Sequence, residues 1–208
     1  MSRKYTSNID GGQTSVVTCL PMNPVTHLFL SWTIADPCNM PLKEKKLITW
    51  AGVVADLDGL TMVADFANRA LLNTESEYYF RFHHVLTHGL PAAIVFAIAA
   101  AAFATNRLKV AMLALLTFHL HLVCDLIGSR GPDPGDIWPI AYLQPLSSLM
   151  TFRWSHQWEL NAWPNILLTI VLMAIIFRQA FVNGYSPVCF FSKSADDAFV
   201  RTLRSRFE

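Results

Sequence analysis

The sequence predicts an all-α, membrane-embedded helical bundle with about four or five apolar helices. Hydrophobic residues make up 53% of the 208 residues and charged residues only 15%, whereas soluble domains carry about 25% charged residues. The apolar residues also gather in stretches that short polar turns divide. The lipid bilayer is therefore an expected partner. The formal net charge of +1 excludes the basic stripe of a nucleic-acid-binding surface, so no nucleic acid is expected.

The N-terminal part is expected to contain two apolar segments and one mixed helix. Residues 1–20 form a polar arm, and a first apolar segment covers about 25–35 before a proline-containing turn. Residues 43–46 are predicted to be a charged loop. Residues 47–64 form a second apolar segment that carries two aspartates, and the mixed composition of 65–82 predicts an interfacial or extramembrane helix.

Two further apolar segments are expected to form a helical hairpin. Residues 90–105 and 110–127 are apolar, and a polar turn at 106–109 separates them. The composition of 128–137, rich in glycine, proline and aspartate, predicts a loop.

The last third combines an aromatic band with the best spanning segment. Residues 138–163 are rich in Trp, Tyr and Phe, which is typical of a membrane–water interface. Among the apolar segments only 165–182 approaches the roughly 20 residues that a span needs, so the others are predicted to be half-buried helices of one compact bundle. Residues 1–182 are interpreted as one membrane-associated domain and 183–208 as a basic C-terminal tail.

The seven histidines all lie in or near short motifs that also carry aspartates. Imidazole and carboxylate together suit a divalent metal of the zinc, manganese or iron kind. An ionisable group within an apolar segment is costly unless it is paired or bound to a metal. The motifs are THLFLSW with His27, VVADLDGL with Asp56 and Asp58, FHHVLTHGL with His83, His84 and His88, HLHLVCD with His119, His121 and Asp125, and SHQWEL with His156.

The predicted hairpin brings three of these residues together. At about 1.5 Å per residue, His88 and His121 both lie some 20–25 Å from the turn, on the same side. Asp125 follows His121 by four positions and shares its helix face, so the three side chains can bind one ion. His119 faces nearly the other way and belongs to a different contact. A hydrogen-bonded structural pair is the alternative interpretation of His121 and Asp125.

Charge distribution predicts one orientation for the bundle. The basic loops 43–46 and 106–109 and the basic tail belong on the cytoplasmic side. The histidine and aspartate motifs then all fall at segment ends toward the extracytoplasmic side.

These motifs resemble the YdjM-like family of inner-membrane-associated, metal-dependent hydrolases. That family's pattern is an early TH or GH, P-D-x-D, H-R-G-x-T-H-S, H-x-x-x-D and W-P. The order and spacing agree over about residues 25–140. The matching positions here are Thr26-His27, Ala55 to Asp58, His83 to Gly89, His121 to Asp125, and Trp138-Pro139.

The chain departs from the pattern at several positions. Ala55 replaces proline, His84 and Val85 replace arginine and glycine, and Gly89 replaces serine. If the family's arginine binds substrate phosphate, that role is vacant or has shifted to Arg81 or His84. The departures imply an altered substrate or weakened activity.

The family is more distantly similar to zinc-dependent phospholipase C and the P1-type nucleases, which implies a metal core of their kind. Asp58 or Asp56, His83 or His88, His121 and Asp125 would then form the main site. His27 would bind a neighbouring ion that Asp125 bridges. His156 and Glu159 correspond to a third-site pair, but they are three residues apart instead of four, and an interfacial polar pair is the simpler interpretation.

The resemblance implies metal-assisted hydrolysis, with zinc as the expected metal and manganese as the alternative. Whichever of Asp56 and Asp58 is not a ligand would accept a proton from the attacking water, and Thr87 would support a ligand through a hydrogen bond. A phosphoester in a lipid or a lipid-linked molecule is the expected substrate. The alternatives are a non-catalytic protein with a structural or transport metal site, and a regulatory or interaction protein that has lost activity.

Overall fold

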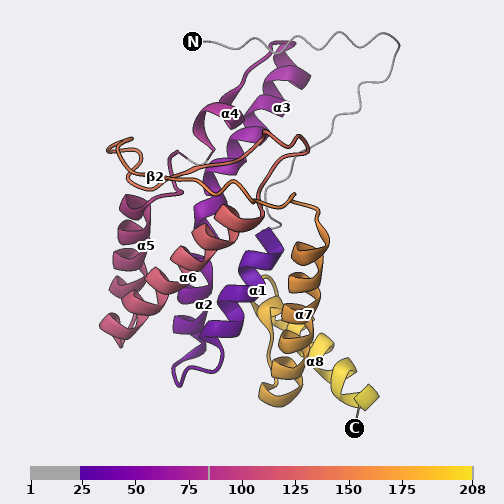
Figure 1. Ribbon diagram of the computed structural model, residues 1–208. Coiled ribbons are helices and arrows are strands. Elements are labelled where there is room, and N and C mark those ends of the chain that lie inside the picture. The colour runs from indigo at the N-terminus through magenta and orange to yellow at the C-terminus, as the bar shows by residue number, and fades with distance from the viewer. Residues whose placement is uncertain (1–23, 84, 208) are drawn as a thin grey trace.

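The computed structural model describes residues 24–83 and 85–207 and consists mainly of helices (Figure 1). The predicted polar arm and His84 lie outside the described residues. In chain order the elements are α1 (Pro24–Ala35), α2 (Leu42–Ala51), the 3-10 helix η1 (Val54–Leu60), α3 (Thr61–Leu72), α4 (Tyr78–Phe82), α5 (Leu90–Ala102), α6 (Arg107–Gly128), β1 (Ile140–Ala141), β2 (Thr151–Phe152), α7 (Trp163–Asn183), the 3-10 helix η2 (Pro187–Phe190) and α8 (Lys193–Phe207).

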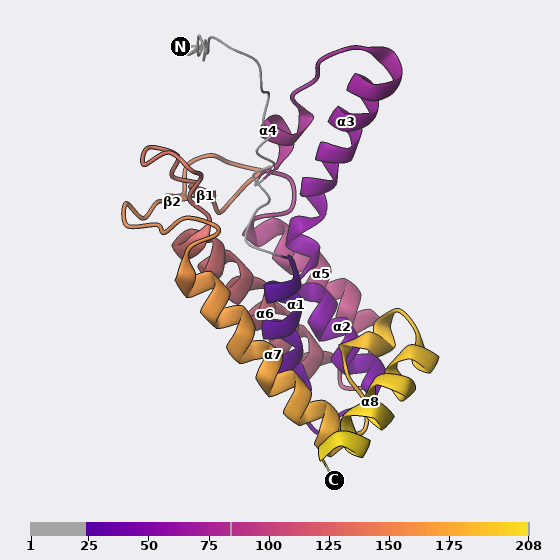
Figure 2. The same cartoon turned by 90° about the vertical axis from the view of Figure 1, so that its right-hand side faces the viewer.

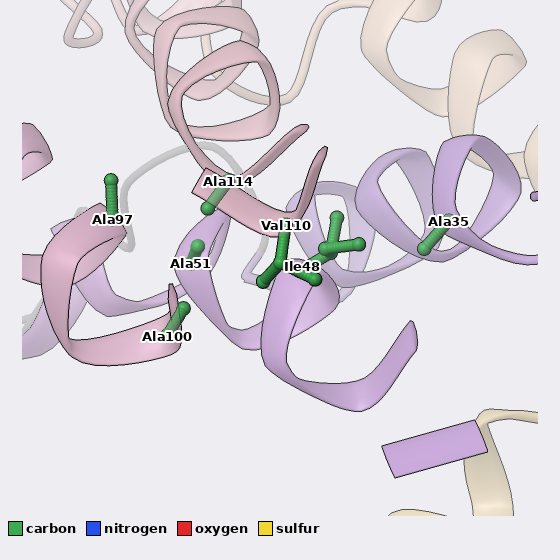
Figure 3. Packing of buried hydrophobic residues seen from close by; sticks show 7 residues of the cluster. All are labelled: Ala35, Ile48, Ala51, Ala97, Ala100, Val110 and Ala114. Atoms are coloured by element: carbon green, nitrogen blue, oxygen red, sulfur yellow. The ribbon is translucent and has the colours of Figure 1, made fainter. Parts of the chain in front are cut away.

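The centre of the bundle is packed with small side chains. Helices α5 and α6 form the predicted hairpin, α2 packs on α6 and α1, and α1 packs on α7. Alanines at the contacts allow the helix backbones to approach closely, as is common between membrane helices. The buried cluster, shown in Figure 3, consists of Ala35, Ile48, Ala51, Ala97, Ala100, Val110 and Ala114.

Two helices within the described residues, α6 and α7, are long and apolar enough to cross a membrane. Helix α2 together with η1 and α3 would make a third span, bent by 53°. The prediction that only 165–182 approaches spanning length was therefore wrong. Helix α6 has 22 residues, because the expected turn at 106–109 forms its first turn. The Asn106 side chain caps that turn by accepting a hydrogen bond from the Lys109 N–H at 3.3 Å.

The expected charged loop at 43–46 lies within α2. Glu44 is buried, and its carboxylate accepts hydrogen bonds from the backbone N–H groups of Thr105 at 2.7 Å and Asn106 at 3.3 Å. Lys45 is also buried and contacts Asp36. The charged side chains of Glu44 and Lys45 therefore pair with polar groups at this end of the bundle. Composition, which predicted a loop here, does not reveal these partners.

The helix predicted for 65–82 is interrupted. Asn73 adopts a left-handed conformation with φ of 49° and ends α3, and α4 begins at Tyr78 after an extended segment. The α3–α4 pair projects beyond the end of the bundle where η1, the start of α5 and the end of α6 lie (Figures 1 and 2). Helix α8 lies at the opposite end.

Residues 183–207, expected as a basic tail, fold back onto the bundle. Helix α8 contacts η2 and α7. The buried carboxylate of Asp196 accepts hydrogen bonds from Ser186, at 2.9 Å from the N–H and 2.6 Å from the hydroxyl. Trp32 of α1, Ile176 of α7 and Cys189 of η2 share a small apolar cluster. A domain boundary at residue 182 remains a prediction.

Candidate metal centre

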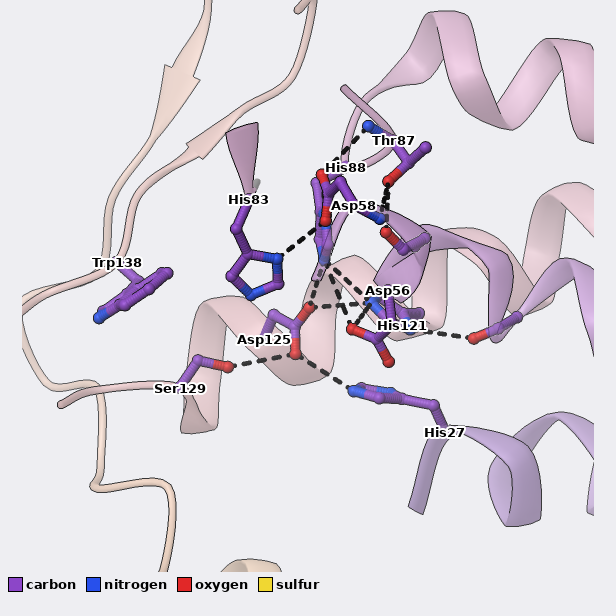
Figure 4. A network of polar contacts seen from close by, with 12 residues as sticks. His27, Asp56, Asp58, His83, Thr87, His88, His121, Asp125, Ser129 and Trp138 are labelled. Carbon is purple, nitrogen blue, oxygen red and sulfur yellow. Dashed lines mark hydrogen bonds and ion pairs between the residues drawn. The ribbon is translucent and has the colours of Figure 1, made fainter. Parts of the chain in front are cut away.

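Side chains from five parts of the chain meet at one end of the bundle (Figure 4). They come from the first turn of α1, from η1, from the two ends of the α4–α5 connection and from the C-terminal half of α6. All are buried except Asp56, whose side chain is 9% exposed. The residues form two groups that could each hold a metal ion, His27, Asp56, His121 and Asp125 in one and Asp58, His83 and His88 in the other.

Four donor atoms from these two groups lie close together. They are the Nε2 atoms of His88 and His121, Oδ1 of Asp56 and Oδ2 of Asp125. The two nitrogens are 3.4 Å apart. The His88 nitrogen lies 3.7 Å from Asp56 and 3.5 Å from Asp125, and the His121 nitrogen lies 3.6 Å and 3.0 Å from the same oxygens.

These five separations, from 3.0 to 3.7 Å, are comparable to the roughly 3.4 Å that zinc bonds of about 2.1 Å at tetrahedral angles would give between ligand atoms. Two imidazoles and two carboxylates are also a donor set that zinc and manganese accept. The residues therefore fit a divalent metal ion.

Hydrogen bonds to the other ring nitrogens orient both imidazoles. Nδ1 of His121 donates to the carbonyl oxygen of Gly52 at 2.9 Å. Because a carbonyl can only accept, Nδ1 carries a proton, and the neutral imidazole would then present the lone pair of Nε2 to the donor cluster. Nδ1 of His88 lies 3.1 Å from Oδ2 of Asp58. This is the carboxylate–histidine arrangement that holds metal-binding imidazoles in position.

Asp58 is fully engaged in such contacts. Its Oδ1 lies 2.8 Å from Nδ1 of His83, and its Oδ2 accepts from the Thr87 N–H at 3.2 Å. The Thr87 hydroxyl in turn donates to the Ala55 carbonyl oxygen at 2.6 Å. Thr87 thus ties the loop before α5 to η1, as part of the shell around the cluster.

The carboxylate of Asp56 differs from that of Asp58 in its hydrogen bonds. Neither of its carboxylate oxygens has a hydrogen-bond partner among the residues that the structure describes. Burying a carboxylate without compensation is costly. The Nε2 atoms of His88 and His121 lie 3.7 and 3.6 Å from its Oδ1. A cation between them would provide the missing compensation.

Asp125 connects the four donor atoms to His27. Its Oδ1 lies 3.2 Å from Nε2 of His27 and accepts from the Ser129 hydroxyl at 3.1 Å, while its Oδ2 faces His121. The rings of His27 and His121 stack with centroids 3.8 Å apart. Asp125 therefore presents one oxygen to His27 and the other to His121.

The electrostatic setting of His88 reflects the surrounding carboxylates. Burial by itself lowers the pKa of this imidazole, but the contacts with Asp125, Asp56 and Asp58 outweigh burial and raise the pKa well above the usual range. The cluster thus has an excess of negative charge that favours a bound cation.

Other candidate residues lie away from the cluster. His119 contacts the Leu115 carbonyl oxygen at 2.7 Å and the Tyr142 hydroxyl at 2.9 Å. His156 is exposed, and Glu159 pairs with Arg130 at 2.7 Å, so these two do not join the site. The Arg81 side chain is exposed and lies over the ring of Phe82.

Gly52 and Ser129 are parts of the site that sequence reasoning did not identify. A Cβ atom on Gly52 would lie 2.9 Å from Cβ of Ser31 and 3.2 Å from Cβ of Thr117. Only glycine therefore allows α2 to approach α1 and α6 closely enough for its carbonyl to reach His121. A glycine inside an apolar helical stretch was the available signal.

The fold and the cluster define a helical membrane protein with a buried histidine–aspartate site that could hold a metal ion. A model of the YdjM inner membrane protein family matches residues 22–190, so the chain belongs to this family. Membership of the YdjM family is thereby confirmed, and hydrolase activity remains a prediction. Searches of curated proteins and of solved structures found no match. The similarity to phospholipase C and P1 nuclease remains a prediction.

Proposed function

We propose that the protein is a membrane-bound, metal-dependent hydrolase that cleaves phosphoester bonds in a lipid or lipid-linked substrate. The observation that carries the proposal is the close spacing of four donor atoms, one of them from Asp56, whose carboxylate lacks a hydrogen-bond partner among the described residues. The order of the motifs shared with the hydrolase family supports the reaction class.

Zinc is the proposed metal and manganese the alternative, held by His88, His121, Asp56 and Asp125. When bound, the ion would take up a water in addition to these donors, lower the pKa of that water and polarise the phosphoryl oxygen. His27 and the second oxygen of Asp125 offer ligands for a neighbouring ion. The group of Asp58, His83 and His88 is better explained as support, because Asp58 already orients both imidazoles.

Asp56 is the proposed proton acceptor. Its Oδ2 is free of hydrogen bonds to the described residues, and its side chain is the one partly exposed member of the cluster. Asp58 is unsuitable, because both of its oxygens are engaged by His83, His88 and Thr87. One oxygen of Asp56 would face the metal and the other the incoming water.

The surroundings of Asp56 support a lipid substrate. The same helix η1 exposes Leu57 and Leu60 next to this carboxylate. An apolar rim around a charged centre suits a molecule with a phosphorylated head and an acyl or prenyl tail.

The test is a hydrolysis assay on detergent-purified protein with zinc or manganese, using bis-p-nitrophenyl phosphate and then short-chain phospholipids. Wild type should release product, and Asp56→Asn and His121→Ala should lose at least about 10²-fold in rate. His156→Ala, an exposed histidine outside the cluster, should retain wild-type activity. Equal rates in all four proteins, or no activity in metal-loaded wild type, would contradict the proposal.

A further inference from the structure

The segment from Ile140 to Phe152, called the 140–152 hairpin below, exposes large apolar side chains. It contains no charged residue. Leu146 is 81% exposed and Leu149 94% exposed, and Met150 and Phe152 are also exposed. A soluble surface rarely displays so many neighbouring apolar side chains without a partner.

The position of the hairpin in the chain indicates which kind of partner covers these apolar side chains. It lies between α6 and α7, which are each long and apolar enough to span a membrane. The connection between two consecutive spans must lie at one membrane surface. The preceding loop of the same connection carries the charges of Arg130, Asp133 and Asp136, so only the later part is suited to lipid.

The hairpin is held firmly against the bundle. Its strands pair Ile140 with Phe152, and Ile140 is buried. The Leu90 N–H donates to the Tyr142 carbonyl oxygen at 2.7 Å, and the Tyr142 hydroxyl lies 2.9 Å from Nε2 of His119. Leu146 and Leu149 are therefore presented at the tip of an anchored element.

Gly89 makes the close approach of the hairpin possible. A Cβ atom at this position would lie 2.8 Å from the Gln144 carbonyl oxygen and 2.9 Å from that of Tyr142. Both atoms belong to the backbone and cannot rotate away. Position 89, directly after His88, therefore has room only for glycine while the hairpin packs this closely.

The hairpin projects sideways from the bundle, close to the start of α5 (Figures 1 and 2). The outer face of α5 exposes Ile94, Val95 and Ile98. An element that extends sideways at the end of such a helix would lie along a membrane surface that α5 itself enters.

We propose that the 140–152 hairpin inserts Leu146 and Leu149 into the lipid leaflet on the side of the histidine–aspartate cluster. Leucine side chains would occupy the boundary between headgroups and acyl chains. Tyr142 within the hairpin and Trp154, two residues after its end, suit the headgroup level. The contact is independent of whether the cluster hydrolyses a substrate. It would hold the leaflet surface next to His88.

Photo-crosslinking in the full-length chain tests the contact. Benzoylphenylalanine replaces Leu149 in one protein and the exposed Asp133 in the matched control, with all other residues native. Each protein is reconstituted into vesicles of phosphatidylethanolamine and phosphatidylglycerol, irradiated and analysed by peptide mass spectrometry. Both positions are exposed, so neither change should prevent folding.

A phospholipid adduct is expected on the peptide that carries position 149 and should be absent at position 133. Benzoylphenylalanine at position 146 should behave like that at position 149. Equal lipid labelling at 149 and 133, or a crosslink from 149 to a second copy of the chain instead of lipid, would overturn the proposal.

Discussion

At the residue scale, the two aspartates of one motif have different surroundings. Asp56 and Asp58 are two positions apart on a 3-10 helix, which has three residues per turn, so their side chains point in different directions. Asp58 meets two imidazoles and a backbone N–H, while Asp56 meets no hydrogen-bond donor among the described residues. The sequence left the assignment open because it depends on the local helix type, which a motif does not reveal.

Asp58→Asn should weaken metal binding without removing the site. The amide cannot provide the negative charge that orients His83 and His88, and loss of such a supporting carboxylate typically costs about 10–100-fold in metal affinity. Competition with a chromogenic chelator measures the affinity. Asp56→Asn should have a larger effect, since it removes the negative charge of a proposed direct ligand. An affinity of Asp58→Asn equal to that of wild type would contradict the supporting role.

Gly52→Ala should destabilise the fold and disturb His121. The added methyl group would collide with Cβ of Ser31, and such overpacking costs about 1–3 kcal/mol in the free energy of unfolding. Thermal unfolding in detergent should show a lower Tm, together with weaker metal binding. Gly135→Ala is the matched control, because no atom lies within 4 Å of its added Cβ. An unchanged Tm for Gly52→Ala would show that the helices can separate without cost.

At the scale of elements, the predicted α5–α6 hairpin was the most reliable part of the sequence interpretation. Its length placed His88 beside His121, and the i, i+4 spacing placed Asp125 on the same face. The sequence could not foresee that Glu44 and Lys45 are buried in α2, because their partners Thr105, Asn106 and Asp36 lie in other elements. Composition alone therefore predicted a loop, because the sequence does not show the tertiary partners of these charged residues.

Lys45→Met should destabilise the end of the bundle opposite the cluster. Lys45 pairs with Asp36 at 3.3 Å and donates to the Tyr185 hydroxyl at 2.8 Å. Removing one partner of a buried ion pair leaves the other uncompensated, at a cost of about 3–5 kcal/mol. The Tm should fall strongly.

The double variant Asp36→Leu/Lys45→Met should lose much less stability than the sum of the two single variants, because it leaves no unpaired charge. A double-mutant cycle from thermal unfolding gives the coupling. If the effect of the double variant equalled the sum of the two single-variant effects, Asp36 and Lys45 would not be energetically coupled.

At the scale of the whole molecule, the histidine–aspartate cluster lies at one end of the bundle, and the basic residues of 43–46, 106–109 and α8 lie at the other (Figures 1 and 2). The first end carries η1, the start of α5 and the hairpin between α6 and α7, and the second carries the α5–α6 turn and α8 (Figures 1 and 2). The segment order and the spacing of motifs predicted this arrangement. The folding of residues 183–207 onto the bundle could not be predicted, since it depends on the buried contact of Asp196 with Ser186.

The arrangement predicts the orientation of the chain in the inner membrane. Asp133→Cys, at the cluster end, should react with a membrane-impermeant maleimide in cells whose outer membrane is permeabilised and whose inner membrane is intact. Lys109→Cys, at the basic end, should react only after the inner membrane is permeabilised, because positively charged ends remain cytoplasmic. The native chain measures background labelling by its own cysteines. The reverse pattern would place the cluster on the cytoplasmic side.

The central claim is that the cluster binds a metal ion, and elemental analysis of detergent-purified protein tests it most directly. Wild type and His156→Ala should contain stoichiometric zinc or manganese, either as purified or after reconstitution. His121→Ala/Asp125→Ala, which removes two of the four donors, should contain none. Folded wild-type protein that binds neither metal after reconstitution, or equal metal content in the double variant, would contradict the account.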